Sequence, residues 1–127
     1  MFTIKGIELF EDGSYLPADM ALVKSLLDLV ERDFTQERDP KIYAMYLETT
    51  IKLLNKCVAF YLGKTVHEVI EQRIHQEALK LLRGTDLTVK EIANVLNLSD
   101  ASWFSRCFRK YEGMSPVECR KKLRSVI

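Results

Sequence analysis

The chain has 127 residues, 47% of them hydrophobic and 29% charged, so it can bury a core and is not expected to be disordered or fibrous. No stretch approaches the roughly 18 consecutive apolar residues of a membrane span, and the first residues lack a secretion signal, so we expect a cytoplasmic protein. The net charge of +1 is uneven, because residues 1–65 hold 8 Lys or Arg against 10 Asp or Glu, whereas residues 66–127 hold 11 against 8.

The first half of the chain predicts an arm followed by helices. Residues 1–19 show a brief apolar alternation, which suggests a short strand or an irregular arm. From residue 20 onward, apolar residues recur at three- and four-residue steps, as in amphipathic helices. Asp39 before Pro40 predicts the start of a short helix, a turn follows at Glu48, and Thr50 is expected to cap a helix over residues 51–62.

The second half continues the helical pattern. T-V-H-E at residues 65–68, T-V-K-E at 88–91 and S-P-V-E at 115–118 are capping boxes, and the first of them opens a long helix over residues 66–83. Asn97 suits a tight turn, after which Ser99 is expected to cap a helix over residues 100–110. Gly84 and Gly113 are placed to end helices in a left-handed conformation.

The two halves repeat one another. Residues 63–69 match residues 113–119 at an offset of 50, and residues 44–50 match residues 93–99 at an offset of 49. The repeated unit is a short helix, a turn and a longer helix, which is a helix-turn-helix. We therefore predict an all-α fold of about seven helices, in which unit 20–65 and unit 84–127 are joined by the linker helix 66–83.

With these units in place, the chain resembles the DNA-binding domain of the AraC/XylS family of transcription regulators. The run DLTVKEIANVLNLSDASWFSRCFRKYEGMSP over residues 86–116 is similar to that family's C-terminal signature, and TIKLLNKCVAFYLGKT over residues 50–65 is a weaker match. The resemblance implies that double-stranded DNA is the partner. It also implies that helices 51–62 and 100–110 enter two successive segments of the major groove.

The resemblance also implies which side chains contact DNA. The base-reading set is Lys52, Asn55, Lys56, Ala101, Ser102, Ser105 and Arg106. The expected phosphate contacts are Thr50, Lys64, Arg109, Lys110, Arg120 and Lys121. The chemistry suits these roles, because Lys and Arg donate to guanine and Asn can pair with adenine. Val58, Ala59 and Phe60 stand where the family has an aromatic residue followed by two lysines, which weakens phosphate anchoring by the first unit.

Other readings of these residues stay open. A charged helix face is often only solvated. The spacing of Phe104 and Phe108 indicates core residues rather than a surface on which bases stack. Trp103 lies off that apolar stripe. Cys57 and Cys107 share a repeat position and are expected to be buried. The three cysteines suit neither a disulfide framework nor a zinc site, and no metal site is expected at the two histidines.

Signatures of catalysis are absent from the sequence. We find no nucleotide-binding glycine loop, no His pair with a catalytic Glu and no nucleophile elbow, so we expect no enzyme, no cofactor and no small-molecule site. The alternative function is a protein-interaction module of the same fold that contacts another regulator or RNA polymerase. Residues before Asp19 cannot form a sensor domain, so the chain is either a short standalone regulator or the C-terminal piece of a longer one.

Overall fold

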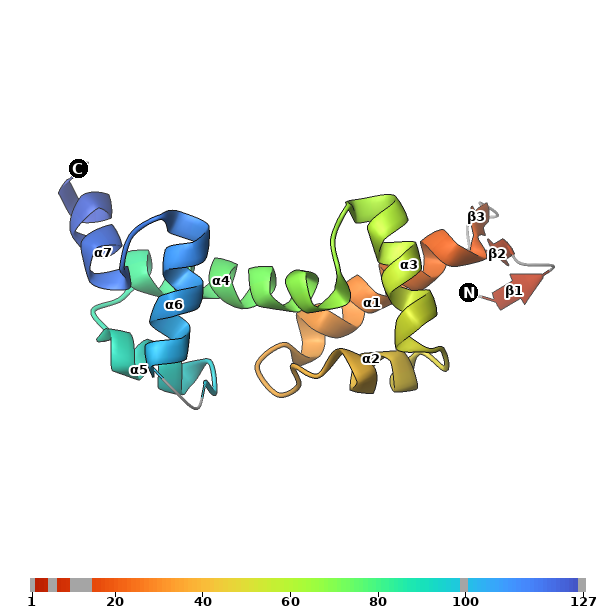
Figure 1. Ribbon diagram of the computed structural model, residues 1–127, viewed down its shortest axis with the longest axis horizontal. Helices are drawn as coiled ribbons and strands as arrows, with labels where there is room; N and C mark the ends of the chain where they lie inside the picture. The colour runs from red at the N-terminus through yellow and green to blue at the C-terminus, as the bar shows by residue number, and fades with distance from the viewer. Residues whose placement is uncertain (1, 5–6, 10–14, 99–100, 126–127) are drawn as a thin grey trace. The chain divides into compact units, whose positions relative to one another are not determined.

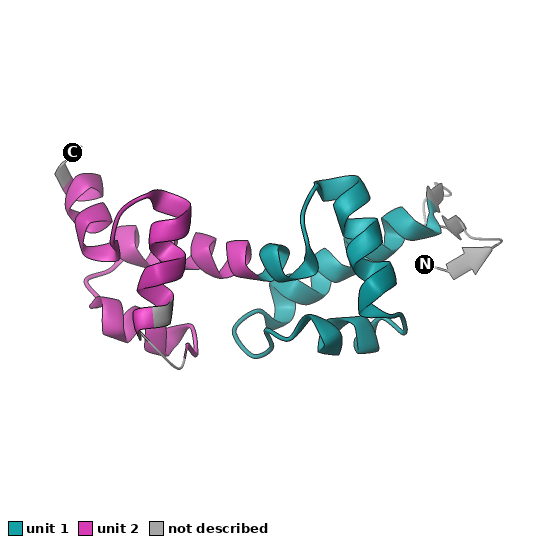
Figure 2. Cartoon of the chain, in the orientation of Figure 1, with its two compact units in different colours: residues 1–70 teal, residues 71–127 magenta. Residues whose placement is uncertain are grey.

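The computed structural model describes residues 2–4, 7–9, 15–98 and 101–125 (Figure 1). The chain divides into two compact units, Met1–Ile70 and Glu71–Ile127 (Figure 2). Seven helices lie in the described part of the chain, which confirms the predicted all-α class. The N-terminal arm adds a small antiparallel sheet of three strands in the order β1-β2-β3.

The first unit consists of this sheet, three complete helices and the start of a fourth. Its elements are β1 (Phe2–Ile4), β2 (Ile7–Leu9), β3 (Tyr15–Pro17), α1 (Ala18–Asp33), α2 (Pro40–Tyr46) and α3 (Ile51–Leu62). Both α1 and α2 pack on α3, and Leu26, Tyr43 and Leu54 from these three helices are fully buried. The hydroxyl of Tyr43 donates to the carbonyl of Glu37 at 2.8 Å, so this buried polar group is satisfied. This core holds the short α2 and the longer α3 as a helix-turn-helix.

The second unit repeats that arrangement. Its elements are most of α4 (Val66–Gly84), then α5 (Val89–Val95), α6 (Ala101–Glu112) and α7 (Pro116–Ser125). Helices α5 and α7 both pack on α6, with Ile92, Leu96, Phe104 and Phe108 in the core. The expected burial of Phe104 and Phe108 is confirmed. Helix α4 is continuous across the unit boundary, since residues 66–70 belong to the first unit and residues 71–84 to the second.

The internal repeat is visible in the backbone. Glu48 and Asn97, 49 residues apart, both adopt a left-handed conformation, with φ of 56° and 59°. Each turn is closed by the same bond, from Thr49 to Ala44 in one unit and from Leu98 to Ala93 in the other. The turn therefore depends on a positive φ, which Asn adopts readily and Glu less so.

Side chains cap the helices as the sequence predicts. Asp39 accepts from the backbone of Lys41 at 2.9 Å, and Thr50 accepts from Leu53 at 3.1 Å. Thr88 and Glu91 form a reciprocal capping box, as do Thr65 and Glu68. Such caps satisfy amide groups that have no partner within the helix. The expected cap at Ser99 lies outside the described residues.

The prediction for one glycine is wrong. Gly113 has the expected left-handed conformation, with φ of 73°, and Gly63 has one as well, but Gly84 is the last residue of α4 and its φ is not positive. The reason is that the side chain of Arg120 caps the end of α4. The guanidinium of Arg120 donates to the carbonyls of Leu82 and Thr85, at 3.1 and 3.4 Å, so α4 needs no left-handed residue to satisfy its end.

Within the part of the chain that the structure describes, no helix has the length and apolar character needed to cross a membrane. The same residues hold no group of three or more His, Cys, Asp or Glu side chains that could bind a metal ion.

Candidate nucleic-acid interface

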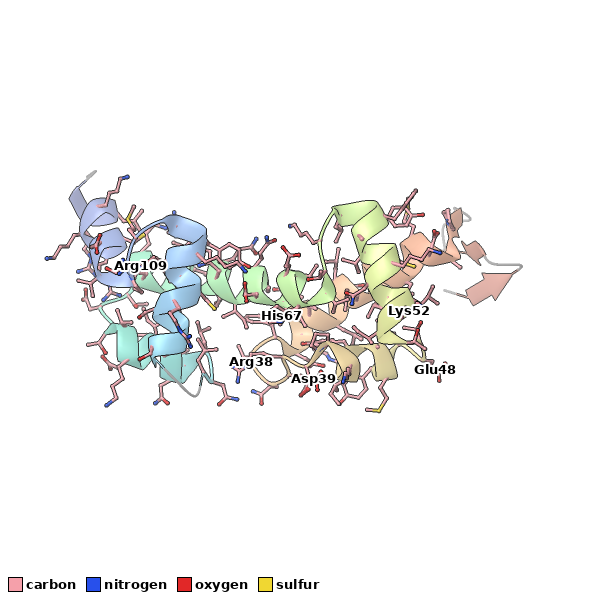
Figure 3. The ribbon with its side chains drawn as sticks, in the orientation of Figure 1. Arg38, Asp39, Glu48, Lys52, His67 and Arg109 are labelled. Atoms are coloured by element: carbon pink, nitrogen blue, oxygen red, sulfur yellow. The ribbon has the colours of Figure 1, made fainter. Side chains whose placement is uncertain are left out.

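Helix α6 presents a polar face opposite its buried stripe. Phe104 and Phe108 point into the core of the second unit, which leaves a different set of side chains on the outer surface. A shallow hollow of about 380 Å³ on this surface is lined by Ser102, Ser105, Arg106 and Arg109. Arg109 is labelled on α6 in Figure 3. Four of the sequence-predicted contacts thus share one face.

The two arginines on this face are exposed and carry no ion pair among the residues that the structure describes. Their guanidinium groups are planar forks of donors that match phosphate oxygens or the O6 and N7 atoms of guanine. The two serine hydroxyls beside them can donate or accept. This face can therefore bind a polyanion and also discriminate between base edges. The side chains of Ala101 and Trp103 lie outside the described set.

Two other basic residues of this unit are engaged within the protein. The ammonium group of Lys110 lies 3.0 Å from a carboxylate oxygen of Glu71, which is buried on α4. The guanidinium of Arg120 caps the end of α4, as described above. Phosphate contact by either residue must compete with these bonds. Lys121 is exposed on α7 and is available to solvent.

Helix α3 presents the corresponding face of the first unit. Lys52 and Lys56 are exposed on it, and the helix contains no acidic residue (Figure 3). Thr50 lies at its N-terminus, where the hydroxyl oxygen accepts from Leu53 but the hydroxyl hydrogen stays free to donate. Lys64 follows the helix and is half-buried.

Asn55 is turned toward α4. Its Oδ1 accepts from the backbone of Val66, the first residue of α4, at 2.8 Å, and the side chain is half-buried. Bidentate pairing with adenine uses both the oxygen and the amide nitrogen. Base reading by Asn55 would therefore require this bond to break.

Apolar residues also reach the surface of α3, which the sequence indicated only in part. Of the unusual run at residues 58–60, Val58 is fully buried, whereas Phe60 is 78% exposed. Leu53, seven residues earlier on the same side, is 49% exposed. These side chains line a hollow of about 530 Å³ together with Asp19, Lys56, Cys57 and Ala59. The i to i+7 spacing was the available signal, although the same spacing is equally typical of core residues.

The three cysteines are wholly or partly withdrawn from solvent. Cys57 is buried as expected, whereas Cys107, which was also expected to be buried, is half-buried. Cys119 is buried, and none of the three thiols forms a disulfide. Burial raises the pKa of the Cys107 thiol above its usual value, and the nearby carboxylate of Glu71 raises it further. A raised pKa disfavours the thiolate that oxidation and nucleophilic attack require.

Comparison with known proteins identifies related sequences. A family model described as a helix-turn-helix domain matches residues 43–122. The xylose operon regulatory protein of Haemophilus influenzae is 32% identical over 75 residues, which cover 59% of this chain and 19% of that protein. The ornithine utilization regulator of Pseudomonas aeruginosa is 38% identical over 60 residues, which cover 47% and 18%. The chain thus spans about a fifth of the length of these curated relatives.

Solved structures share the fold. The C-terminal domain of AraT, a response regulator from Geobacillus stearothermophilus, superposes with a TM-score of 0.75 at 24% identity, covering 80% of this chain and 84% of that one. The DNA-binding domain of AdpA, solved in complex with a target DNA, gives a TM-score of 0.73 at 18% identity, covering 82% and 93%.

Proposed function

Because the chain belongs to the AraC-type helix-turn-helix family of DNA-binding transcription regulators, we propose that α3 and α6 are its two recognition helices and that each enters the major groove of double-stranded DNA. The observation that carries this proposal is the outer face of α6, where Ser102, Ser105, Arg106 and Arg109 line one hollow. Arg106 and Arg109 are exposed and have no carboxylate partner among the residues that the structure describes, so this pair is complementary to a polyanion rather than to a neutral or basic surface.

The residues of α6 have different roles in this proposal. Arg106 reads a guanine through O6 and N7, and the two serines donate to neighbouring base edges. Arg109, one helical turn after Ser105, contacts a phosphate and so sets the register without reading sequence. Ala101 is retained from the family pattern as an apolar contact, of the kind that alanine makes with a thymine methyl group.

The first unit binds DNA less strongly in this proposal. Lys52 and Lys56 are its base-reading residues, and Thr50 and Lys64 contact the backbone. Asn55 contributes only through its amide nitrogen, because its oxygen is bonded to Val66. Phe60 occupies surface where a cation would strengthen the contact with phosphate.

One chain then reads two adjacent half-sites, and these need not be palindromic. The DNA-binding domain of AdpA, solved in complex with a target DNA, shares this fold, and that likeness supports DNA binding by the present chain. We further propose that the chain is the DNA-reading part of a regulator that acts in the cytoplasm. Contact with RNA polymerase would need a surface for a protein partner, and the exposed apolar hollow that α3 helps to line is one such surface.

Selection of bound sites from a random DNA library tests this function. We expect a site with two parts, and we expect the affinity for it to fall steeply with salt, because each neutralised phosphate contributes about 0.9 to the slope of log K against log salt. Mobility shifts between about 50 and about 200 mM salt measure that slope. If no sequence is enriched and no salt-sensitive binding occurs, DNA reading is wrong and the protein-interaction alternative gains support.

A further inference from the structure

We infer that Glu71 is the positioning residue of the second recognition helix: it sets the rotation of α6 against α4 and keeps the charge of Lys110 from DNA phosphates. This inference rests on the proposed function of α6. Glu71 is 7% exposed and is the one buried charged residue in the described part of the chain. A buried carboxylate is costly unless it is paired and hydrogen-bonded, so its partners decide what it does.

Three partners of Glu71 come from one turn of α6. The hydroxyl of Tyr111 donates to Oε1, the Lys110 ammonium lies 3.0 Å from the same oxygen, and the Cys107 thiol lies 3.9 Å from Oε2. Residues 107, 110 and 111 are spaced i, i+3 and i+4, which places them on one side of a helix. The carboxylate of Glu71 on α4 thus contacts three side chains on one side of α6.

A second contact one turn along α4 fixes the same region. His75 Nε2 lies 2.6 Å from Glu112 Oε1. The imidazole ring stacks on Tyr111, with ring centroids 5.1 Å apart, and meets the ring of Phe108 edge-on at 4.9 Å. Tyr111 is therefore held by its hydroxyl group and by its ring. Two attachments one turn apart restrict both the rotation and the axial position of α6.

Rotation of α6 matters because another side of the same helix carries the hollow lined by Ser102, Ser105, Arg106 and Arg109. An α-helix with its side chains is about 10–12 Å across, so a rotation of about 20° moves the outer surface by about 2 Å. A hydrogen bond to a base edge does not survive a displacement of that size. Leucine in place of Glu71 would pack without setting such an angle, because apolar contacts are not directional.

The ion pair has an electrostatic consequence as well. Lys110 is 58% exposed, yet its charge is balanced by the carboxylate beside it. It is therefore not a phosphate contact in the intact protein, although its place in the basic run with Arg109 makes it look like one. Loss of the Glu71 charge alone leaves the charge of Lys110 without a carboxylate at Glu71 to balance it, and so adds one net positive charge at this part of α6.

Glu71→Gln separates the positioning of α6 from the neutralisation of Lys110. Its amide oxygen still accepts from Tyr111, so α6 keeps its position, but Lys110 loses its counterion. We expect the slope of log K against log salt to steepen by about 0.9 on any DNA, with little change in the selected sequence. The double variant Glu71→Gln with Lys110→Gln should return to the wild-type slope. A single variant with an unchanged slope would overturn the electrostatic half of the inference.

Glu71→Leu removes the anchor entirely, and Gln76→Leu, at an exposed position of α4, is its matched control. We expect specificity to fall about tenfold in the half-site read by α6, which equals the loss of one good base contact, and to stay unchanged in the other half. Selection from the random library measures both halves at once. Equal specificity of the Glu71→Leu and Gln76→Leu variants in the α6 half-site would overturn the inference. A wild-type chain that binds no DNA would instead overturn the proposed function, and the inference with it. Should Glu71→Leu fail to melt cooperatively, Tyr111→Phe gives the same readout with a smaller perturbation.

Discussion

Replacement of Arg106 by alanine is the sharpest test of the interface. The side chain is exposed, lines the hollow on α6 and has no ion pair among the described residues, so its removal should change the free energy of unfolding by less than about 0.5 kcal/mol. A bidentate arginine-guanine contact discriminates by about 1–3 kcal/mol, which corresponds to roughly 5- to 150-fold in affinity. The whole of that loss should fall on sequences that carry the preferred base.

Arg109→Ala is the matched comparison, because Arg109 lines the same hollow and is also exposed. If it contacts a phosphate, its loss weakens all sequences alike and reduces the salt slope by about 0.9. Lys110 would be a poor comparison, since its ammonium group is already paired with Glu71.

The assay is fluorescence anisotropy on the selected site and on sites with single substitutions, at several salt concentrations. Arg106→Ala should flatten the preference at one base pair and leave the others intact. A uniform loss over all sites would reassign Arg106 to the DNA backbone. No loss in either variant would refute the reasoning that places this face of α6 against DNA.

Three further outcomes are expected. Replacing Lys52 and Lys56 together by alanine should relax selection in one half of the site only, and a library selection that loses both halves or neither would contradict two independent readers. One alanine inserted between Ile70 and Glu71, at the boundary of the two units on α4, rotates the following residues by about 100° and shifts them by about 1.5 Å. Affinity for the selected site, measured by mobility shifts, should fall toward the non-specific level. The variant should still show a cooperative thermal melt. Phe60→Lys adds a cation at an exposed position of α3 and should raise affinity for every sequence, steepening the salt slope by about 0.9; an unchanged slope would mean that this side of α3 does not face DNA.

Local features of the structure were predictable from the sequence. The capped starts at Pro40, Ile51 and Val89 follow from Asp39, Thr50 and Thr88, because a cap and its helix lie within four residues of each other. The repeat at offsets of 49 and 50 also anticipated the two helix-turn-helix units, since equal local sequences favour equal local conformations.

The fate of individual polar side chains was not predictable in this way. Asn55 and Arg120 were expected to contact DNA, and Glu71 was given no role. In the structure they bond to Val66, Tyr111 and the end of α4, respectively. The last of these contacts also explains the wrong expectation for Gly84, whose left-handed cap became unnecessary.

The sequence by itself determined where helices begin and which stripe of each is apolar, because these properties depend on neighbours within about four residues. Its internal repeat also indicated a double helix-turn-helix. Only the tertiary structure decided which cations are bonded within the protein. Glu71 and Lys110 are 39 residues apart in the chain and 3.0 Å apart in space, and no local pattern encodes such a meeting. A charge that is already paired within the fold must give up that partner before it can pair with a DNA phosphate.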